Sequence, residues 1–162
     1  MDTLEKVALE LLKERGVTLN DMTELVYYLQ SQYHDDLSKE ECYDNVVKVL
    51  KKREVQNAII TGIEIDRLAE EKKLTEPLQT IIENDEGLYG VDEIVAFSVI
   101  NVYGSIGFTN YGYIDKLKPG ILKDLNDKSN GCHTFLDDIV GAIAAAASSR
   151  LAHSQDHEVE DD

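Results

Sequence analysis

Apolar residues recur at helical spacing through most of the chain, and no stretch of useful length alternates as a half-buried strand does. The first stripe consists of Leu4, Val7, Ala8, Leu11 and Leu12. Gly16 supplies a stop signal after it, and the capping-box form of Ser38 to Glu41 predicts another helix start. We expect helices at residues 4–12, from about 20, at 38–50, at 54–72, from about 75, at 91–103, at 121–126 and at 135–152.

Two of the predicted helices differ from ordinary surface helices. Helix 91–103 is apolar on most sides, which is typical of a helix buried among others. Helix 135–152 contains Ala142 and alanines at 144–147, whose small side chains let a neighbouring backbone approach closely, so we expect it to be central or to face a second subunit. Residues 110–120 are predicted to be irregular. With no repeat and no linker, the sequence predicts an all-α, single-domain bundle of about six or more helices with a largely buried central helix.

The net charge of the chain excludes some classes of binding partner. The 162 residues include 16 Lys and Arg against 32 Asp and Glu, a formal net charge of −16. Binding to nucleic acid requires cationic side chains, and anionic bilayers repel such a chain, so we expect no nucleic-acid partner and at most transient contact with a membrane. Part of the excess lies in residues 153–162, which we expect to be an acidic disordered tail after a folded domain at 1–152.

A membrane span and a secreted disulfide protein are both disfavoured. Residues 94–114 carry no charge and are long enough to cross a bilayer, but glycines and polar residues interrupt them, so we expect a buried core helix and no transmembrane segment. Cys42 and Cys132 are far apart and no secretory signal precedes them. We therefore expect reduced thiols and a cytoplasmic protein.

Three acidic blocks carry the candidate chemistry. They are Asp92-Glu93, Asp115 with Lys116, Lys118 and Pro119, and Asp137-Asp138. If two helix starts meet at one end of the bundle, these carboxylates converge and repel one another unless a cation compensates them. Magnesium prefers hard oxygen ligands and keeps waters free for a phosphate, which a lysine such as Lys118 would bind.

Structural interpretations remain open for each block. Thr134 and Asp137 fit a capping box, which would make Asp137 structural and leave Asp138 unexplained. Asp92 and Glu93 would be ordinary first-turn acids, which the helix dipole favours. Asp115 and its neighbouring lysines would be surface charges of a loop.

The order of these blocks resembles the phosphatidylglycerophosphatase A family, whose pattern runs Asp-Glu, Asp-x-x-Lys-Pro and Asp-Asp-(Ile/Val)-Val-Ala-Gly. The chain looks most like the soluble branch of that family found in Firmicutes. It lacks the family's N-terminal Pro-Gly-Thr-x-Gly-Ser block, has Gly112 where an Arg often stands, and reverses the final Ala-Gly to Gly141-Ala142.

The resemblance implies a magnesium-dependent phosphomonoester hydrolase, with manganese as a substitute metal. In the family, the reaction converts phosphatidylglycerophosphate to phosphatidylglycerol and phosphate; here the substrate is either a phospholipid head group or a soluble phosphate ester. The implied roles are catalytic for Asp115 and Asp138, phosphate-binding for Lys118 and Lys116, and metal-binding for Asp92, Glu93, Asp137 and Asp138. Asp115 would be the general base or a further metal ligand.

A second hypothesis belongs to another class: a non-catalytic helical binding or regulatory protein that keeps a remnant of the acidic site. The two hypotheses differ in what they predict for the fold. An enzyme requires the acidic blocks to converge around a cavity, whereas a remnant allows them to scatter. The sequence also leads us to expect a homo-oligomer.

Overall fold

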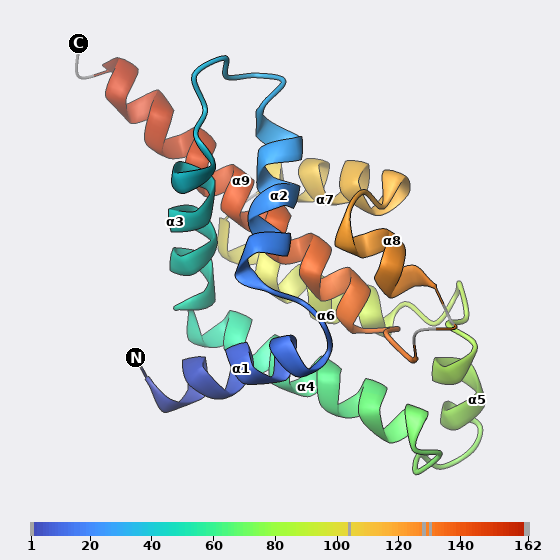
Figure 1. The fold of residues 1–162 in the computed structure, drawn as a ribbon. Coiled ribbons are helices and arrows are strands. Elements are labelled where there is room, and N and C mark those ends of the chain that lie inside the picture. Colours follow the sequence, from blue (N-terminus) through green and yellow to red (C-terminus); the bar gives the residue numbers. More distant parts are fainter. Residues whose placement is uncertain (1, 104, 128, 130, 161–162) are drawn as a thin grey trace.

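The computed structural model describes residues 2–103, 105–127, 129 and 131–160. Within these residues every regular element is a helix, as Figure 1 shows. In chain order they are α1 (Thr3–Glu14), α2 (Leu19–Gln30), α3 (Lys39–Leu50), α4 (Arg53–Glu70), α5 (Leu78–Glu83), α6 (Val91–Ile100), the short 3-10 helix η1 (Asn101–Tyr103), α7 (Ser105–Leu117), α8 (Ile121–Asn126) and α9 (Leu136–Glu160). The predicted all-α, single-domain fold is confirmed.

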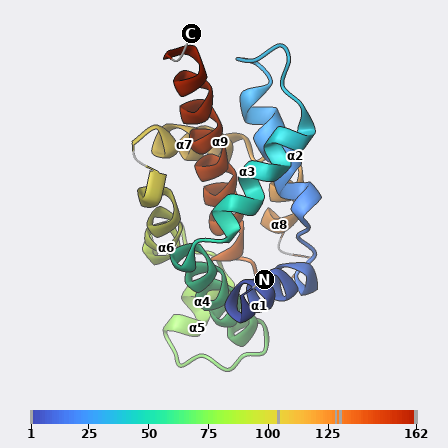
Figure 2. The same cartoon turned by 90° about the vertical axis from the view of Figure 1, so that its left-hand side faces the viewer.

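Helix α9 is the axis of the bundle. It contacts α2, α3, α4, α6, α7 and α8, and both views of the ribbon show it running through the middle of the other helices (Figures 1 and 2). Every residue from 133 to 149 is buried. The small residues from Gly141 to Ser149 allow this crowding, because a helix surrounded on all sides must let its neighbours approach its backbone closely.

Three details of the predicted helices are wrong. The helix at 91–103 is not buried on all sides, because Val91 is 47% and Ile94 64% exposed; the central place belongs to α9, which agrees with one of the two positions expected for helix 135–152. The segment 110–120 is irregular only over its last three residues, because α7 continues through Gly112 to Leu117. Finally, α9 does not end at Ala152 but continues to Glu160, while residues 161–162 of the predicted tail lie outside the described residues.

Gly107 has a packing role inside α7 and does not break the helix. A Cβ on Gly107 would lie 2.7 Å from a methyl group of Ile100, so glycine there permits close contact between α7 and the end of α6. A glycine inside a helix costs only about 1 kcal/mol relative to alanine, which packing readily offsets. Among the described residues, no helix is both long and apolar enough to span a bilayer.

Gly62 lets α4 cross directly over the first turns of α9. A Cβ at this position would collide with the side chain of Ile139 and lie 3.0 Å from that of Phe135. Both side chains are fully buried, so neither can move aside cheaply. This crossing brings the polar end of α4 against the start of α9.

We predict that Gly62→Ala lowers the free energy of unfolding by about 1–3 kcal/mol, the usual cost of adding a methyl group to a packed core. Gly112→Ala is the matched control, because Gly112 also lies inside a helix but has open space around its missing Cβ. The control should stabilise the protein by about 0.5–1 kcal/mol, since alanine is the better helix former. Equal effects in chemical denaturation would contradict the crossing geometry.

Candidate functional site

A polar cavity of about 180 Å³ opens where the start of α6, the end of α7 and the start of α9 meet. Its lining residues are Asp85, Glu86, Gly87, Asp92, Glu93, Asp115, Lys118, Asn126, Asp137 and Asp138. The fold thus gathers all three acidic blocks at one place. Of the predicted catalytic, phosphate-binding and metal-binding residues, Lys116 alone is absent from this lining; it is exposed on α7.

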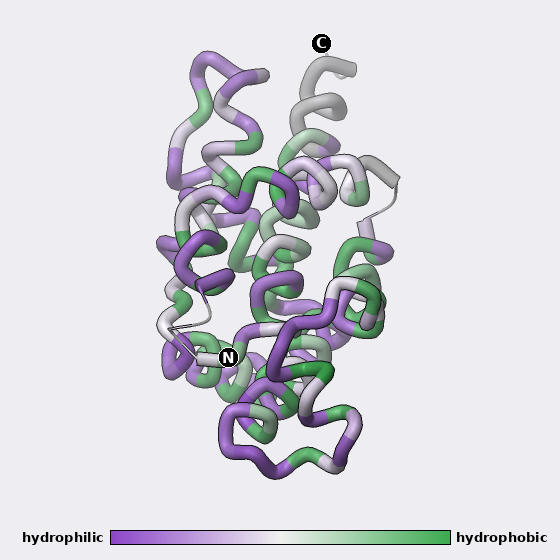
Figure 3. Tube along the Cα trace, turned by 90° about the vertical axis from the view of Figure 1, so that its right-hand side faces the viewer, coloured by the Kyte–Doolittle hydropathy of each residue, from purple (hydrophilic) through white to green (hydrophobic). Residues whose placement is uncertain are grey.

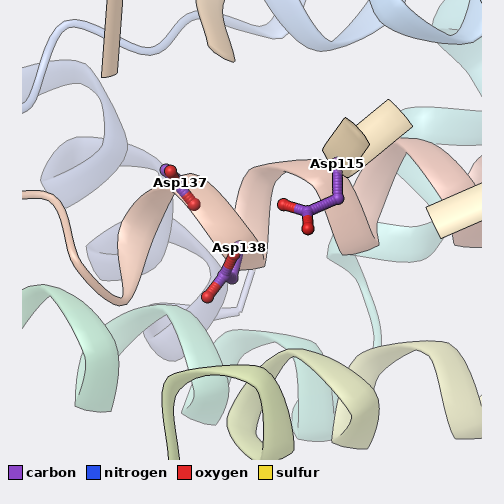
Figure 4. Close-up of side chains that lie close together, drawn as sticks. All are labelled: Asp115, Asp137 and Asp138. Atoms are coloured by element: carbon purple, nitrogen blue, oxygen red, sulfur yellow. The ribbon is translucent and has the colours of Figure 1, made fainter. Parts of the chain in front are cut away.

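Three carboxylates form the compact centre of the cavity. Asp115, Asp137 and Asp138 each offer an oxygen, and these oxygens lie within 4.8 Å of one another. Figure 4 shows Asp137 and Asp138 on the first turn of α9 and Asp115 close beside them. A group of hard oxygen donors at this spacing fits a magnesium-sized cation that retains some of its waters.

The composition of this centre differs from the predicted metal set. Asp115 belongs to the compact group, whereas Asp92 and Glu93 do not. Successive residues on a helix point about 100° apart, so the first turn of α6 turns Asp92 inward, where it is 8% exposed, and leaves Glu93 exposed. Asp92 borders Asp138 and contributes to its electrostatic environment. The metal-binding and catalytic roles of all these residues remain predictions.

Burial and mutual repulsion disfavour full ionisation of the cluster. Burial raises the pKa of Asp138 strongly, and the neighbouring carboxylates of Asp137 and Asp92 raise it further. Burial also raises the pKa of Asp137. In the absence of a cation, Asp138 therefore keeps a proton at neutral pH. A divalent cation would replace that proton, because it compensates the same crowded negative charge.

Lys118 supplies the positive charge already present in the cluster. Its Nζ lies 3.1 Å from Asp115 Oδ1 and 3.5 Å from Asp137 Oδ2. Burial alone would lower the pKa of Lys118, but the two carboxylates outweigh this effect and raise it. The backbone of Lys118 is left-handed, with φ of +45°. Such strain in a residue other than glycine is typical of functional sites and persists only where the surroundings fix it.

The sequence places Asp115 and Lys118 in an irregular loop, which is wrong for Asp115 and correct for Lys118. Asp115 lies in the last turn of α7, and Lys118 follows the final residue of that helix. The peptide N–H of Lys118 still donates to the Ile114 carbonyl at 2.8 Å. The helix therefore fixes Asp115 more rigidly than a loop would, and the strained turn directs Lys118 back toward α9.

Asp66 of α4 fixes the start of α9, and sequence reasoning missed it. Its carboxylate is fully buried and accepts the N–H groups of Phe135 and Leu136, both at 2.9 Å. These are two of the donors that a helix leaves unsatisfied at its N-terminus. A signal was available: Asp66 stands three residues after Ile63 and seven after Ile59, on the apolar stripe of α4. An acid there must be buried, and a buried acid needs donors.

Other contacts tie down the segment before α9. The Thr134 hydroxyl donates to the Ile82 carbonyl at 2.6 Å, and Arg15 Nη2 donates to the Cys132 carbonyl at 2.6 Å. The predicted capping box is therefore wrong. Thr134 is engaged with the end of α5, and the N–H of Asp137 donates to the carbonyl of His133 at 3.0 Å. Because Asp137 has no capping duty toward Thr134, its side chain is available to the cavity.

Tyr111 is a second residue that the sequence did not single out for the site. It lies on α7 beside Asp138 and is 5% exposed, so its hydroxyl group is buried among acidic side chains. Burial first and the charge of Asp138 second raise the pKa of its hydroxyl far above the ordinary value. Among the described residues this hydroxyl has no hydrogen-bond partner of good geometry. A buried polar group without such a partner calls for an explanation, and a bound ligand or water is one.

Known proteins share this fold and sequence. Residues 8–153 match the family model described as "Phosphatidylglycerophosphatase A". The chain is 70% identical over 155 residues to "Uncharacterized protein YutG" of Bacillus subtilis (strain 168), which covers 95% of this chain and 93% of that protein. A solved structure of a "Protein of Unknown Function from Bacillus stearothermophilus" has a TM-score of 0.92 and 70% identity, covering 95% of this chain and 96% of that one. The "low temperature requirement C protein from Listeria monocytogenes" has a TM-score of 0.93 and 62% identity, covering 95% and 98%.

Asp66 gives the metal-free protein a defined pH dependence. Burial raises the pKa of Asp66 from 3.8 to about 7, and the two backbone donors offset this only in part. The folded chain thus holds this proton more tightly than the unfolded chain does. The resulting stabilisation is fully present below about pH 4 and is lost as the pH rises through about 7.

We predict that Asp66→Asn removes this component. The free energy of unfolding of the parent protein should decline relative to that of the variant between about pH 4 and about pH 8, by on the order of 4 kcal/mol at most. Chemical denaturation in EDTA measures the difference, and Asp44→Asn, a change to an exposed acid on α3, is the control. If the parent instead gains stability relative to Asp66→Asn as the pH rises, the two N–H donors dominate over burial.

Proposed function

Because the chain belongs to the phosphatidylglycerophosphatase A family, as its three acidic blocks predicted, we propose that it is a magnesium-dependent phosphatase. Its substrate in this proposal is a phosphate monoester carried on a lipid, as in phosphatidylglycerophosphate. The observation that supports this most is the convergence of Asp115, Asp137 and Asp138 within 4.8 Å, with the ammonium group of Lys118 beside them. Three acids and a lysine in a small polar cavity suit a phosphate group and its counter-ion.

The residues divide by position in the proposed reaction. Asp137 and Asp138 are the more buried pair and hold the metal. Asp92 interacts with the carboxyl group of Asp138 and contributes to its electrostatic environment. When bound, magnesium polarises the phosphoryl oxygens and neutralises their charge. Lys118 then exchanges its carboxylate partners for phosphate oxygens, which a lysine binds as a point charge. Its half-buried position at the cavity lets it make this exchange by side-chain rotation.

Asp115 is the general base of this proposal. It is the most exposed of the three central acids, which suits a group that must exchange protons with solvent. Asp115 takes a proton from the attacking water, the water oxygen forms a bond to phosphorus, and the ester P–O bond breaks. The leaving alkoxide takes up a proton, so one water and one ester give one alcohol and one inorganic phosphate. Asp115 then releases its proton to solvent.

The second candidate, a non-catalytic protein with a remnant site, receives less support from the geometry. A remnant has no reason to keep four carboxylates crowded against their own repulsion. Here Asp92, Asp115, Asp137 and Asp138 all line one cavity, and a lysine is held among them in a strained backbone conformation.

Phosphate release tests the proposal. We expect inorganic phosphate to appear from phosphatidylglycerophosphate or from phosphatidic acid in mixed micelles, with a lower rate on glycerol 3-phosphate. Release should require magnesium or manganese and stop in EDTA. A lack of release from every ester with either metal, in protein that melts cooperatively, would contradict the phosphatase assignment.

Asp138→Asn separates function from folding. We predict that the metal-free variant is as stable as the parent or more stable, because the parent must take up a proton at Asp138 when it folds at neutral pH and asparagine avoids that cost. The parent should gain about 2.7 kcal/mol at a magnesium concentration about 100 times the dissociation constant, and the variant should gain nothing and release no phosphate. Asp44→Asn on α3 should keep both properties. A large loss of metal-free stability with the magnesium response intact would make Asp138 a structural hydrogen-bonding residue.

A further inference from the structure

Four exposed aliphatic side chains belong to the segments that line the cavity. Leu88 is 94% exposed, Ile94 64%, Leu117 48% and Val91 47%. Each is the direct chain neighbour of a residue that lines the cavity, namely Gly87, Glu93, Lys118 and Asp92 in the same order. They come from the α5–α6 connection, the start of α6 and the end of α7. We call these four residues the apolar rim.

Part of the rim continues into a stretch of the chain that lacks charged residues. The chain has a net charge of −16, yet residues 94–114, which include most of α6 and α7, contain no Asp, Glu, Lys or Arg. Val102 and Phe108 in this stretch are also exposed. Figure 3 faces the side that carries α5 and the α5–α6 connection, where green hydrophobic segments interrupt the purple polar trace. Exposed apolar groups gathered beside a cavity are typical of a surface with a partner.

The cavity determines which partner fits. A phosphate on a lipid reaches the cavity only if the protein comes to the bilayer, because the acyl chains strongly prefer to stay in hydrocarbon. The residues around the mouth then touch the interfacial region first. Anionic head groups repel the acidic residues that line the cavity, so the contact with the interfacial region is made by the uncharged aliphatic side chains next to them. A second copy of the chain fits less well, since it would set two acidic cavities against each other.

We propose that Leu88, Val91, Ile94 and Leu117 insert into the interfacial region of a phospholipid bilayer and so present a lipid-borne phosphate to the cavity. This inference rests on the proposed function for its substrate. The membrane contact itself is measurable without any catalysis. In this arrangement Leu88, the most exposed of the four, penetrates furthest. Lys118, next to Leu117, meets the phosphate at the level of the head groups.

Vesicle flotation tests the rim directly. The probe is a vesicle of phosphatidylcholine with a minor fraction of phosphatidic acid, in magnesium. The double variant Leu88→Ser with Ile94→Ser should float about tenfold less than the parent or lower still, because it removes two inserted aliphatic side chains. The control is Tyr33→Ser, which removes a 70% exposed aromatic side chain from the α2–α3 connection, at the top of Figure 1 and outside the apolar rim. This control should float like the parent.

Activity on two kinds of substrate provides the second readout. The double variant should lose phosphate release from vesicles while keeping the parent's rate on water-soluble glycerol 3-phosphate. Equal flotation of parent and double variant, or no flotation of the parent, overturns the proposal that the apolar rim inserts into the bilayer. A change from oligomer to monomer with flotation unchanged also overturns it and makes the rim a contact between copies. If flotation depends on the rim but no ester releases phosphate, membrane insertion by the rim is supported and the proposed phosphatase function is rejected.

Discussion

The carboxylate of Asp66 sets the position of the whole candidate site. It accepts the first two N–H groups at the start of α9, and those groups belong to the residues immediately before Asp137 and Asp138. Gly62, one turn earlier on α4, allows the helices to approach closely enough for these bonds to form. The first turn of α9 is thereby fixed to α4, and the direction of both aspartates follows from the helix geometry.

This arrangement crowds carboxylates together and so favours the cation-bound protein over the cation-free one. Asp66 already satisfies the helix end, so the aspartates of α9 are not needed as caps. They remain buried beside Asp92 and Asp115, with Lys118 as the cation in contact with them. Raised pKa values in the cluster express the cost of that crowding. Acidic residues that destabilise the fold by their crowding commonly bind a ligand. At such sites the protein is less stable than it would be without the functional residues.

The sequence predicted the helical fold and the meeting of its acidic blocks because both depend on local or repeated signals. Apolar periodicity located most helices, and the order of Asp92-Glu93, Asp115 and Asp137-Asp138 pointed to the family. Local patterns misled where long-range packing decides the outcome. Glycines suggested a break at 110–120, but α7 runs through Gly112 to Leu117 and packs on α9. Thr134 suggested a cap, but its hydroxyl bonds to Ile82, more than fifty residues away in sequence.

Diffraction from crystals grown with manganese tests the central claim, that Asp137 and Asp138, with Asp115 beside them, hold a divalent cation at a place fixed by Asp66. The account predicts one anomalous difference peak among the three carboxylates, with Asp66 still bonded to Phe135 and Leu136 and with Lys118 turned away from Asp137. No anomalous peak in the cavity at saturating manganese, with both ion pairs of Lys118 intact, would contradict it. In that case the lysine would be the permanent counter-ion of a structural cluster.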